Sequence, residues 1–233
     1  MHFRILTALL ALMTLAACAA RGPQADAGSF QHDVTTAARP WTDEAFDAAP
    51  GKFTFALFSD LTGGERAGVF EVAVEQLRLL RPELIVNVGD LIEGGTTDRG
   101  QLTREWDAFD ERARRAHAPV FYAGGNHDLT NPVMWDVWDE RYGRRYYHFV
   151  YRDVLFLVLD TEDSTAEAQW RLHEIREKAM AAIEAEGWDI FMDTEYGRSP
   201  ERRYGRIGEV QQGYFLDVIA ENPDVRHTFV LLH

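Results

Sequence analysis

Three apolar segments in the middle of the chain each end in a cluster of glycine and polar residues. The apolar segments are 53–58, 84–88 and 120–123, and the clusters are 59–64, 89–95 and 124–128. Apolar residues recur at helical spacing from about Ala67, and this pattern ends before Pro82. Short buried strands that alternate with helices run parallel in one sheet. The pattern therefore predicts an α/β fold with three parallel strands.

Further helices follow from the periodicity and from residues typical of helix starts. They are expected over 101–116, from Pro132 onward, from a capping box of Ser164 and Glu167 to Glu186, and over 207–220. Segment 187–206 has no clear period and is expected to be a loop or lid. Segments 146–151 and 154–159 predict a hairpin that turns at Arg152 and Asp153, and 228–232 predicts a final strand. Asp160 and Glu162, after the hairpin, are interpreted as capping or structural acids.

Polar side chains follow each of the three parallel strands directly. They are Asp60, Asp90, and the consecutive pair Asn126 and His127. Ligands of open α/β sheets bind beyond the carboxyl ends of the strands, so these four side chains are expected to converge. Carboxylate, amide and imidazole ligands suit Mn, Fe, Zn or Mg, and the single cysteine excludes a thiolate site. The sequence predicts a metal centre at this edge of the sheet.

The polar clusters resemble the motifs of the calcineurin-like metallophosphoesterases. That family carries D-x-H, then G-D, then G-N-H-D/E after successive strands. Here Gly89-Asp90 and Gly125-Asn126-His127-Asp128 match the second and third motifs, whereas the first reads Asp60-Leu61-Thr62. The resemblance extends over roughly residues 52–233. It implies an αββα sandwich of two mixed sheets flanked by helices.

The resemblance also implies a ligand set for two divalent metal ions. Asp60 and Asp90 would be ligands, with Asp90 bridging the ions, and Asn126 would bind the second ion. His233 matches the first histidine of a later H-x-P motif and would also bind the second ion. Asp128 is interpreted as a residue that fixes its loop.

The activity implied is hydrolysis of a phosphoester through in-line attack by water or hydroxide at the two ions. In this assignment His127 protonates the leaving oxygen, and Glu93, three residues after Asp90, holds His127 by a hydrogen bond. Neither the choice between monoester and diester nor the rest of the substrate follows from these motifs.

Two departures from the family pattern leave an alternative open. Thr62 occupies the position of an imidazole ligand, and no Gly-His-x-His motif occurs in the chain. The alternative is a degenerate, lipid-anchored binding protein that holds one metal weakly. Because the chain stops at His233, after an apolar segment, we also expect the domain to lack its C-terminal part. A dinucleotide-binding module is disfavoured because no G-x-G-x-x-G follows the first strand.

The charge balance changes which substrates are plausible. The chain has 24 basic and 38 acidic residues in 233, a formal net charge of −14. Such a surface repels the phosphates of DNA and RNA at long range, so nucleic-acid binding is not expected. A phosphate substrate remains compatible because bound metal ions invert the local field. The arginines of segment 201–206 are interpreted as a solvated charge run, with phosphate contacts as the alternative.

The N-terminus predicts export and lipid anchoring. Arg4 precedes an apolar run over 5–17, which is shorter than the roughly 20 residues of a spanning helix. The run ends in Leu15-Ala16-Ala17-Cys18, which resembles a bacterial lipobox, so residues 1–18 are interpreted as a lipoprotein signal peptide. A tether over 19–51, partly ordered around Trp41 and Phe46, then leads to the domain of residues 52–233. The expected location is the cell envelope, on the periplasmic side.

Overall fold

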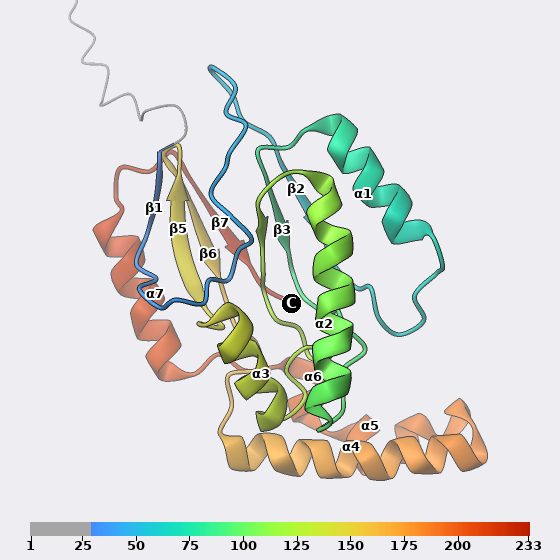
Figure 1. Cartoon of the computed structure of the whole chain (residues 1–233). Coiled ribbons are helices and arrows are strands. Elements are labelled where there is room, and N and C mark those ends of the chain that lie inside the picture. The colour runs from blue at the N-terminus through green and yellow to red at the C-terminus, as the bar shows by residue number, and fades with distance from the viewer. Residues whose placement is uncertain (1–28) are drawn as a thin grey trace, which may run out of the picture.

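A computed structural model describes residues 29–233 of the chain, and its core is built on two sheets (Figure 1). The first sheet has the order β2-β3-β4, and all its pairs are parallel, as the sequence predicts. Its strands are β2 (Phe55–Phe58), β3 (Leu84–Asn87) and β4 (Val120–Phe121). The polar clusters of the sequence therefore follow the carboxyl ends of neighbouring strands.

The second sheet has the order β1-β5-β6-β7 and is mixed. Its strands are β1 (Phe30–His32), β5 (Tyr147–Tyr151), β6 (Val154–Val158) and β7 (His227–Leu231). β5 and β6 form the expected antiparallel hairpin, and β7 pairs parallel to β6. Arg152 and Asp153 at the turn have positive φ angles, as a tight hairpin requires.

Three apolar layers hold the sheets and helices together. Side chains of β3 and β4 pack on those of β5 and β6 between the two sheets. Helices α1 (Val69–Leu80), α2 (Arg99–Ala113) and α3 (Pro132–Tyr142) cover the outer face of the first sheet. Helix α7 (Glu209–Glu221) covers the outer face of the second sheet through Phe215 and Val218. The layers form the αββα sandwich that the family resemblance implies.

Helix α4 (Ala166–Glu186) lies elsewhere, across the carboxyl ends of the first sheet (Figure 1). Gln169 donates to the carbonyls of Leu129 and Thr130, in the loop that follows β4. Arg176 donates to the carbonyl of Gly95, in the loop that follows β3. One helix therefore contacts two of the polar clusters predicted to form the site.

Two local predictions around α4 are wrong. The helix is capped by Thr165, whose hydroxyl accepts from the Ala168 amide, because the hydroxyl of Ser164 bonds to Gln169 instead of to the helix end. Segment 187–206 is not a loop but a series of short helices, η2 (Trp188–Asp193), α5 (Glu195–Arg198) and α6 (Pro200–Tyr204). These helices have only six, four and five residues, which is too few for a periodic apolar pattern to develop.

Residues 29–51 belong to the folded domain, and the prediction of a tether is wrong for this part. β1 pairs with β5, and Val34 and Trp41 are buried between the sheets. The sequence predicted partial order around Trp41 and Phe46, and in the structure these two residues pack against Phe30 and Phe121. Residues 1–28, with the predicted signal peptide, lie outside the described residues.

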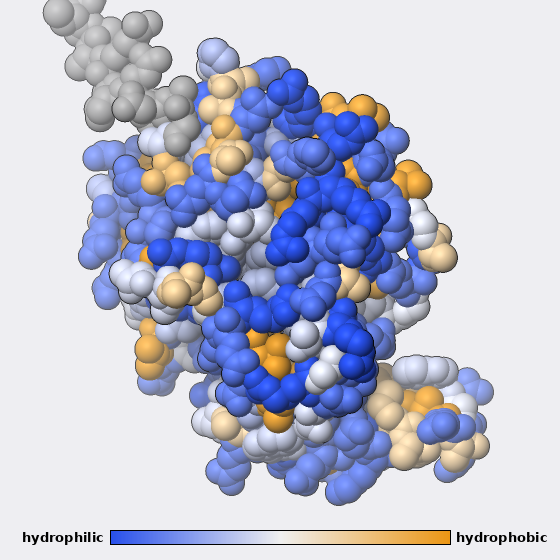
Figure 2. Space-filling model, in the orientation of Figure 1, coloured by the Kyte–Doolittle hydropathy of each residue, from blue (hydrophilic) through white to orange (hydrophobic). Residues whose placement is uncertain are grey.

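The visible surface is mostly hydrophilic, with scattered hydrophobic side chains (Figure 2). No helix among residues 29–233 combines the length and the apolar character needed to cross a membrane.

Candidate metal centre

The loops after β3 and β4 approach each other as closely as backbones can. A Cβ atom on Gly89 would lie 2.7 Å from the backbone of Gly125, and one on Gly125 would lie 2.4 Å from Oδ1 of Asp90. Only glycine at both positions permits this approach. The glycines thus bring Asp90 against the loop that carries Asn126 and His127.

Asp60 and Asp90 both adopt the left-handed backbone region, with φ angles of 58° and 57°. This region is uncommon for residues other than glycine, and strained residues of this kind cluster at functional sites. Backbone hydrogen bonds hold the two loops side by side, from the Asp60 amide to the Gly89 carbonyl and from the Leu61 amide to the Asp90 carbonyl. Hydrogen bonds between the two loops therefore stabilise the strained backbone of Asp60 and Asp90.

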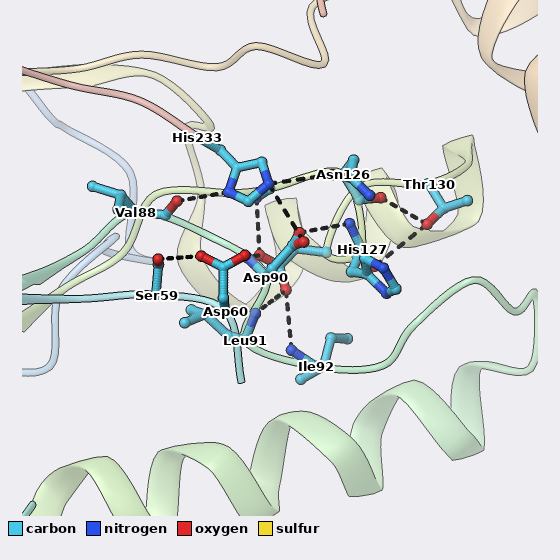
Figure 3. A network of polar contacts seen from close by, with 12 residues as sticks. Ser59, Asp60, Val88, Asp90, Leu91, Ile92, Asn126, His127, Thr130 and His233 are labelled. Atoms are coloured by element: carbon cyan, nitrogen blue, oxygen red, sulfur yellow. Dashed lines mark hydrogen bonds and ion pairs between the residues drawn. The ribbon is translucent and has the colours of Figure 1, made fainter. Parts of the chain in front are cut away.

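Three of the four predicted ligands offer atoms to one point. One donor atom each from Asp60, Asp90 and His233 lies within 4.8 Å of the others (Figure 3). Nε2 of His233 lies 3.4 Å from a carboxylate oxygen of Asp90 and 3.2 Å from Oδ1 of Asn126, the fourth predicted ligand. Asp90 is buried, whereas Asp60 and Asn126 are exposed. The set opens to solvent on one side.

The orientation of His233 is fixed by its other ring nitrogen. Nδ1 lies 2.9 Å from the carbonyl of Val88, which can only accept, so Nδ1 carries a proton. Nε2 then faces oxygen atoms of Asp90 and Asn126. An unprotonated Nε2 would place its lone pair against those of the two oxygens, and a proton or a cation between them relieves this repulsion. Without an ion, the hydrogen bond with Asp90 raises the pKa of His233 to about 9. A backbone carbonyl that orients the far nitrogen is the usual arrangement of a metal-binding histidine.

The charge of Asp90 is stabilised in the same way. Burial by itself raises the pKa of this carboxyl, but hydrogen bonds from His233 and from the His127 amide lower it below its usual value. The carboxylate is therefore ionised and available as a ligand.

Asp128 organises the loops beneath these residues. Its buried carboxylate accepts from the amides of Asp90, Leu91, Ile92 and Gly125. Burial raises the pKa of Asp128 to about 7, and the amide hydrogen bonds act in the opposite direction. The contacts agree with the interpretation that Asp128 fixes the loop, since its oxygens are occupied by backbone donors.

His127 lies beside the donor set, but Glu93 holds it differently from the prediction. Nδ1 of His127 lies 2.9 Å from the backbone carbonyl of Glu93, not from its carboxylate. The carboxylate instead accepts from the Gly63 amide at 3.2 Å. The predicted side-chain hydrogen bond from Glu93 is therefore wrong, because the backbone of that loop already supplies the acceptor.

Several polar and charged residues near Asn126 come from distant segments and were only partly indicated by the sequence. A small pocket beside Asn126 is lined by Glu162, Arg176, Tyr196 and Arg202. Arg176 comes from α4 and Arg202 from α6, 50 or more residues later in the chain. Only the run of arginines at 201–206 was a signal, and it does not separate a pocket residue from a solvated one.

The sequence and the fold were compared with protein families, curated proteins and solved structures. No curated protein matches the chain. Among solved structures, a dimetal phosphatase from Danio rerio has a TM-score of 0.50 and 17% sequence identity, over 78% of this chain and 69% of that one. At that identity the likeness shows the fold alone. The sequence also matches the family described as calcineurin-like phosphoesterase over residues 53–192, more than half of the chain. The protein belongs to the calcineurin-like phosphoesterase family.

Proposed function

We propose that this protein hydrolyses phosphoesters with a dinuclear centre of divalent metal ions. The observation that carries the proposal is the convergence of Asp60, Asp90 and His233, with donor atoms within 4.8 Å of one another, next to Asn126. Family membership supports metal-dependent phosphoester hydrolysis in general. The number of ions and the role of each residue are part of the proposal.

The residues present fit such ions. Carboxylate, amide and imidazole donors suit Mn, Fe, Zn or Mg, and a cation can replace the proton between Nε2 of His233 and the oxygens of Asp90 and Asn126. Asp60 and Asp90 would hold the first ion, and Asp90, Asn126 and His233 the second. When bound, divalent ions act as Lewis acids on the phosphoryl group and lower the pKa of water.

The protein's own side chains would transfer a proton to the leaving group and hold the ligand loops in position. His127 points its Nε2 away from the Glu93 carbonyl, so a protonated ring can donate from Nε2 to the leaving oxygen of a substrate. The His127 amide donates to Asp90, and this bond ties the position of the imidazole to that of the ligand set. Asp128 keeps both loops in register through its four amide contacts.

Replacement of one ligand tests the proposal. Asp90→Ala should lower both the bound metal and the hydrolysis of p-nitrophenyl phosphate by at least about 100-fold, more than the loss of a residue that only supports a ligand. Asp224→Ala, an exposed acid, is the matched control and should change neither. Metal content by mass spectrometry and activity with added Mn, Zn, Fe or Mg are the measurements.

The same experiment separates the degenerate binding protein from the enzyme. Stoichiometric, Asp90-dependent metal without hydrolysis of any mono- or diester would favour the binding protein. Activity that persists in Asp90→Ala would contradict the site itself.

The location is a separate proposal from the enzyme activity. We propose that the protein is anchored by lipid on Cys18, on the outer side of the cytoplasmic membrane. The support is the apolar run that ends at the only cysteine of the chain.

A further inference from the structure

Two arginines from the C-terminal half lie on the same pocket wall as the proposed ligand Asn126. Arg176 of α4 and Arg202 of α6 line this pocket together with Thr130 of the site loop. Both helices belong to the layer that crosses the carboxyl ends of the first sheet (Figure 1). A substrate whose phosphate sits at Asn126 therefore lies next to a pocket lined by two arginines.

Arg202 is held without an acid partner. Within the part of the chain that the structure describes, its Nε atom is buried and has no hydrogen-bond partner. Its guanidinium instead packs on two aromatic rings, 4.9 Å from the ring centre of Phe191 and 5.8 Å from that of Tyr196. In a chain with a net charge of −14, a partly buried arginine of this kind is available for an external anion.

Arg203, the next residue on α6, points to solvent, in contrast to Arg202. Its side chain is exposed and packs on Tyr204, which is itself 73% exposed. The interpretation of segment 201–206 as a solvated charge run therefore holds for Arg203, whereas Arg202 turns into the pocket.

Arg176 is positioned by the site loops. Its Nη1 donates to the carbonyl of Gly95, and a Cβ on Gly95 would lie 2.5 Å from Nη2. The exposed carboxylate of Glu177 is 3.1 Å from Nη1. Gly95 thus leaves room for the guanidinium to pack directly on the loop that follows Asp90.

The pocket adjoins a larger cleft. The pocket itself measures about 20 Å³, enough for about one water molecule. It shares Glu162, Gln169 and Leu172 with a cleft of about 240 Å³. An anionic group bound in this cleft would lie next to the pocket that Arg202 lines. Burial and the charge of Asp160 raise the pKa of Glu162 to about 7, which reduces the negative charge opposing an anion there.

We infer that Arg202, assisted by Arg176, binds a second anionic group on the leaving-group side of the substrate. The substrate class is then a small phosphoester that carries a further phosphate or carboxylate. This inference rests on the proposed function, since it places the scissile phosphate at Asn126. Arginine suits this role because its planar fork binds carboxylate and phosphate through paired hydrogen bonds.

The test compares two substrates that differ in one charge. We would measure kcat and KM for 4-carboxyphenyl phosphate and for its neutral isostere 4-carbamoylphenyl phosphate. Arg202→Ala should raise KM for the carboxylate by about 10- to 100-fold, the range for a lost hydrogen bond to a charged group. KM for the amide should change less than about twofold, with kcat nearly constant for both, because an anion-binding residue acts in binding and not in the chemical step.

Two further variants keep the result interpretable. Arg203→Ala is the matched control, on the same helix, and should leave both KM values unchanged. Arg202→Lys keeps the charge and should recover part of the discrimination, whereas a variant that merely unfolds α6 would raise KM for both substrates. Equal KM changes for the two substrates, or none, would overturn the inference.

Binding of pyrophosphate by calorimetry separates this inference from the proposed function. If no ester is hydrolysed but pyrophosphate binds, and Arg202→Ala weakens that binding while Arg203→Ala does not, the proposed function fails and the anion site stands. If esters are hydrolysed, and Arg202→Ala changes neither KM nor pyrophosphate binding, the proposed function stands and the anion site is wrong.

Discussion

At the scale of single residues, His127 offers the sharpest test of the chemistry. Its Nδ1 is held by the Glu93 carbonyl, so Nε2 is the atom that can serve the leaving oxygen. His127→Ala should slow hydrolysis of alkyl phosphates by about 10²- to 10⁴-fold, the usual contribution of a general acid. Esters of p-nitrophenol should lose much less, because that leaving group needs no proton. Steady-state rates on both esters, with metal content measured alongside, check this prediction.

Glu93→Ala supplies the contrasting variant. Because the contact comes from the backbone, this change should cost far less than His127→Ala. His227→Ala is a second control, because it also removes an imidazole, at an exposed position on β7 outside the proposed site. An equal loss with good and poor leaving groups would count against His127 as the acid.

Glu93 and Arg202 also show where sequence reasoning stops at this scale. The family resemblance implied a contact between Glu93 and His127, but a motif does not say whether the carboxylate or the carbonyl makes the contact. The role of Asp128 was predicted, but three of its four amide donors belong to the loop after β3, a contact that the local sequence does not indicate. Arg202 required the tertiary arrangement of α4 and α6, for which the local sequence has no signal.

At the scale of elements, residues 40–42 act as an extra strand beside β4. The Tyr122 amide donates to the Pro40 carbonyl, the Thr42 amide donates to the Val120 carbonyl, and Trp41 forms a bridge with Phe121. Trp41 is 5% exposed and packs on the ring of Phe121. The segment covers the edge of the strand that leads into Asn126, an edge that would otherwise be open for pairing.

Trp41→Ala should lower the free energy of unfolding by about 3–5 kcal/mol, the range for loss of a buried tryptophan side chain. Trp188→Ala, at a position that is 68% exposed, should stay within about 0.5 kcal/mol of the unchanged protein. Urea denaturation followed by circular dichroism measures both. A Trp41 variant as stable as the Trp188 variant would show that residues 29–51 are the tether predicted from composition.

Periodic elements were predictable from the sequence, and elements made by pairing were not. The apolar period located α1 and α7 within about two residues of their ends, and Pro132 marked the start of α3. β1 has only three residues, and its pairing with β5 depends on residues more than 100 positions away. Short or unpatterned segments such as β1 and 187–206 take their structure from contacts that local propensity does not describe.

At the scale of the whole molecule, the parallel sheet explains why the metal centre could be predicted at all. Parallel strands point the same way, so residues that follow β2 and β3 directly, Asp60 and Asp90, must meet at one edge. His233 joins them from the second sheet, because β7 runs parallel to β6 and its end reaches the Val88 carbonyl. That second part depends on how the two sheets pack, and only the family motif suggested it.

The proposed location of the molecule depends on a residue outside the described part of the chain, Cys18. The apolar run before it is shorter than the roughly 20 residues of a spanning helix, so the proposed attachment is through lipid on that cysteine. Each buried methylene of an acyl chain contributes about 0.8 kcal/mol to membrane binding, and a serine cannot carry a thioether-linked lipid. Cys18→Ser should therefore move the protein from the membrane fraction to the soluble fraction, as measured by fractionation and immunoblotting, with phosphatase activity unchanged. A Cys18→Ser protein that stays in the membrane fraction after cleavage of the signal would contradict the lipid anchor and would point to attachment through the folded domain.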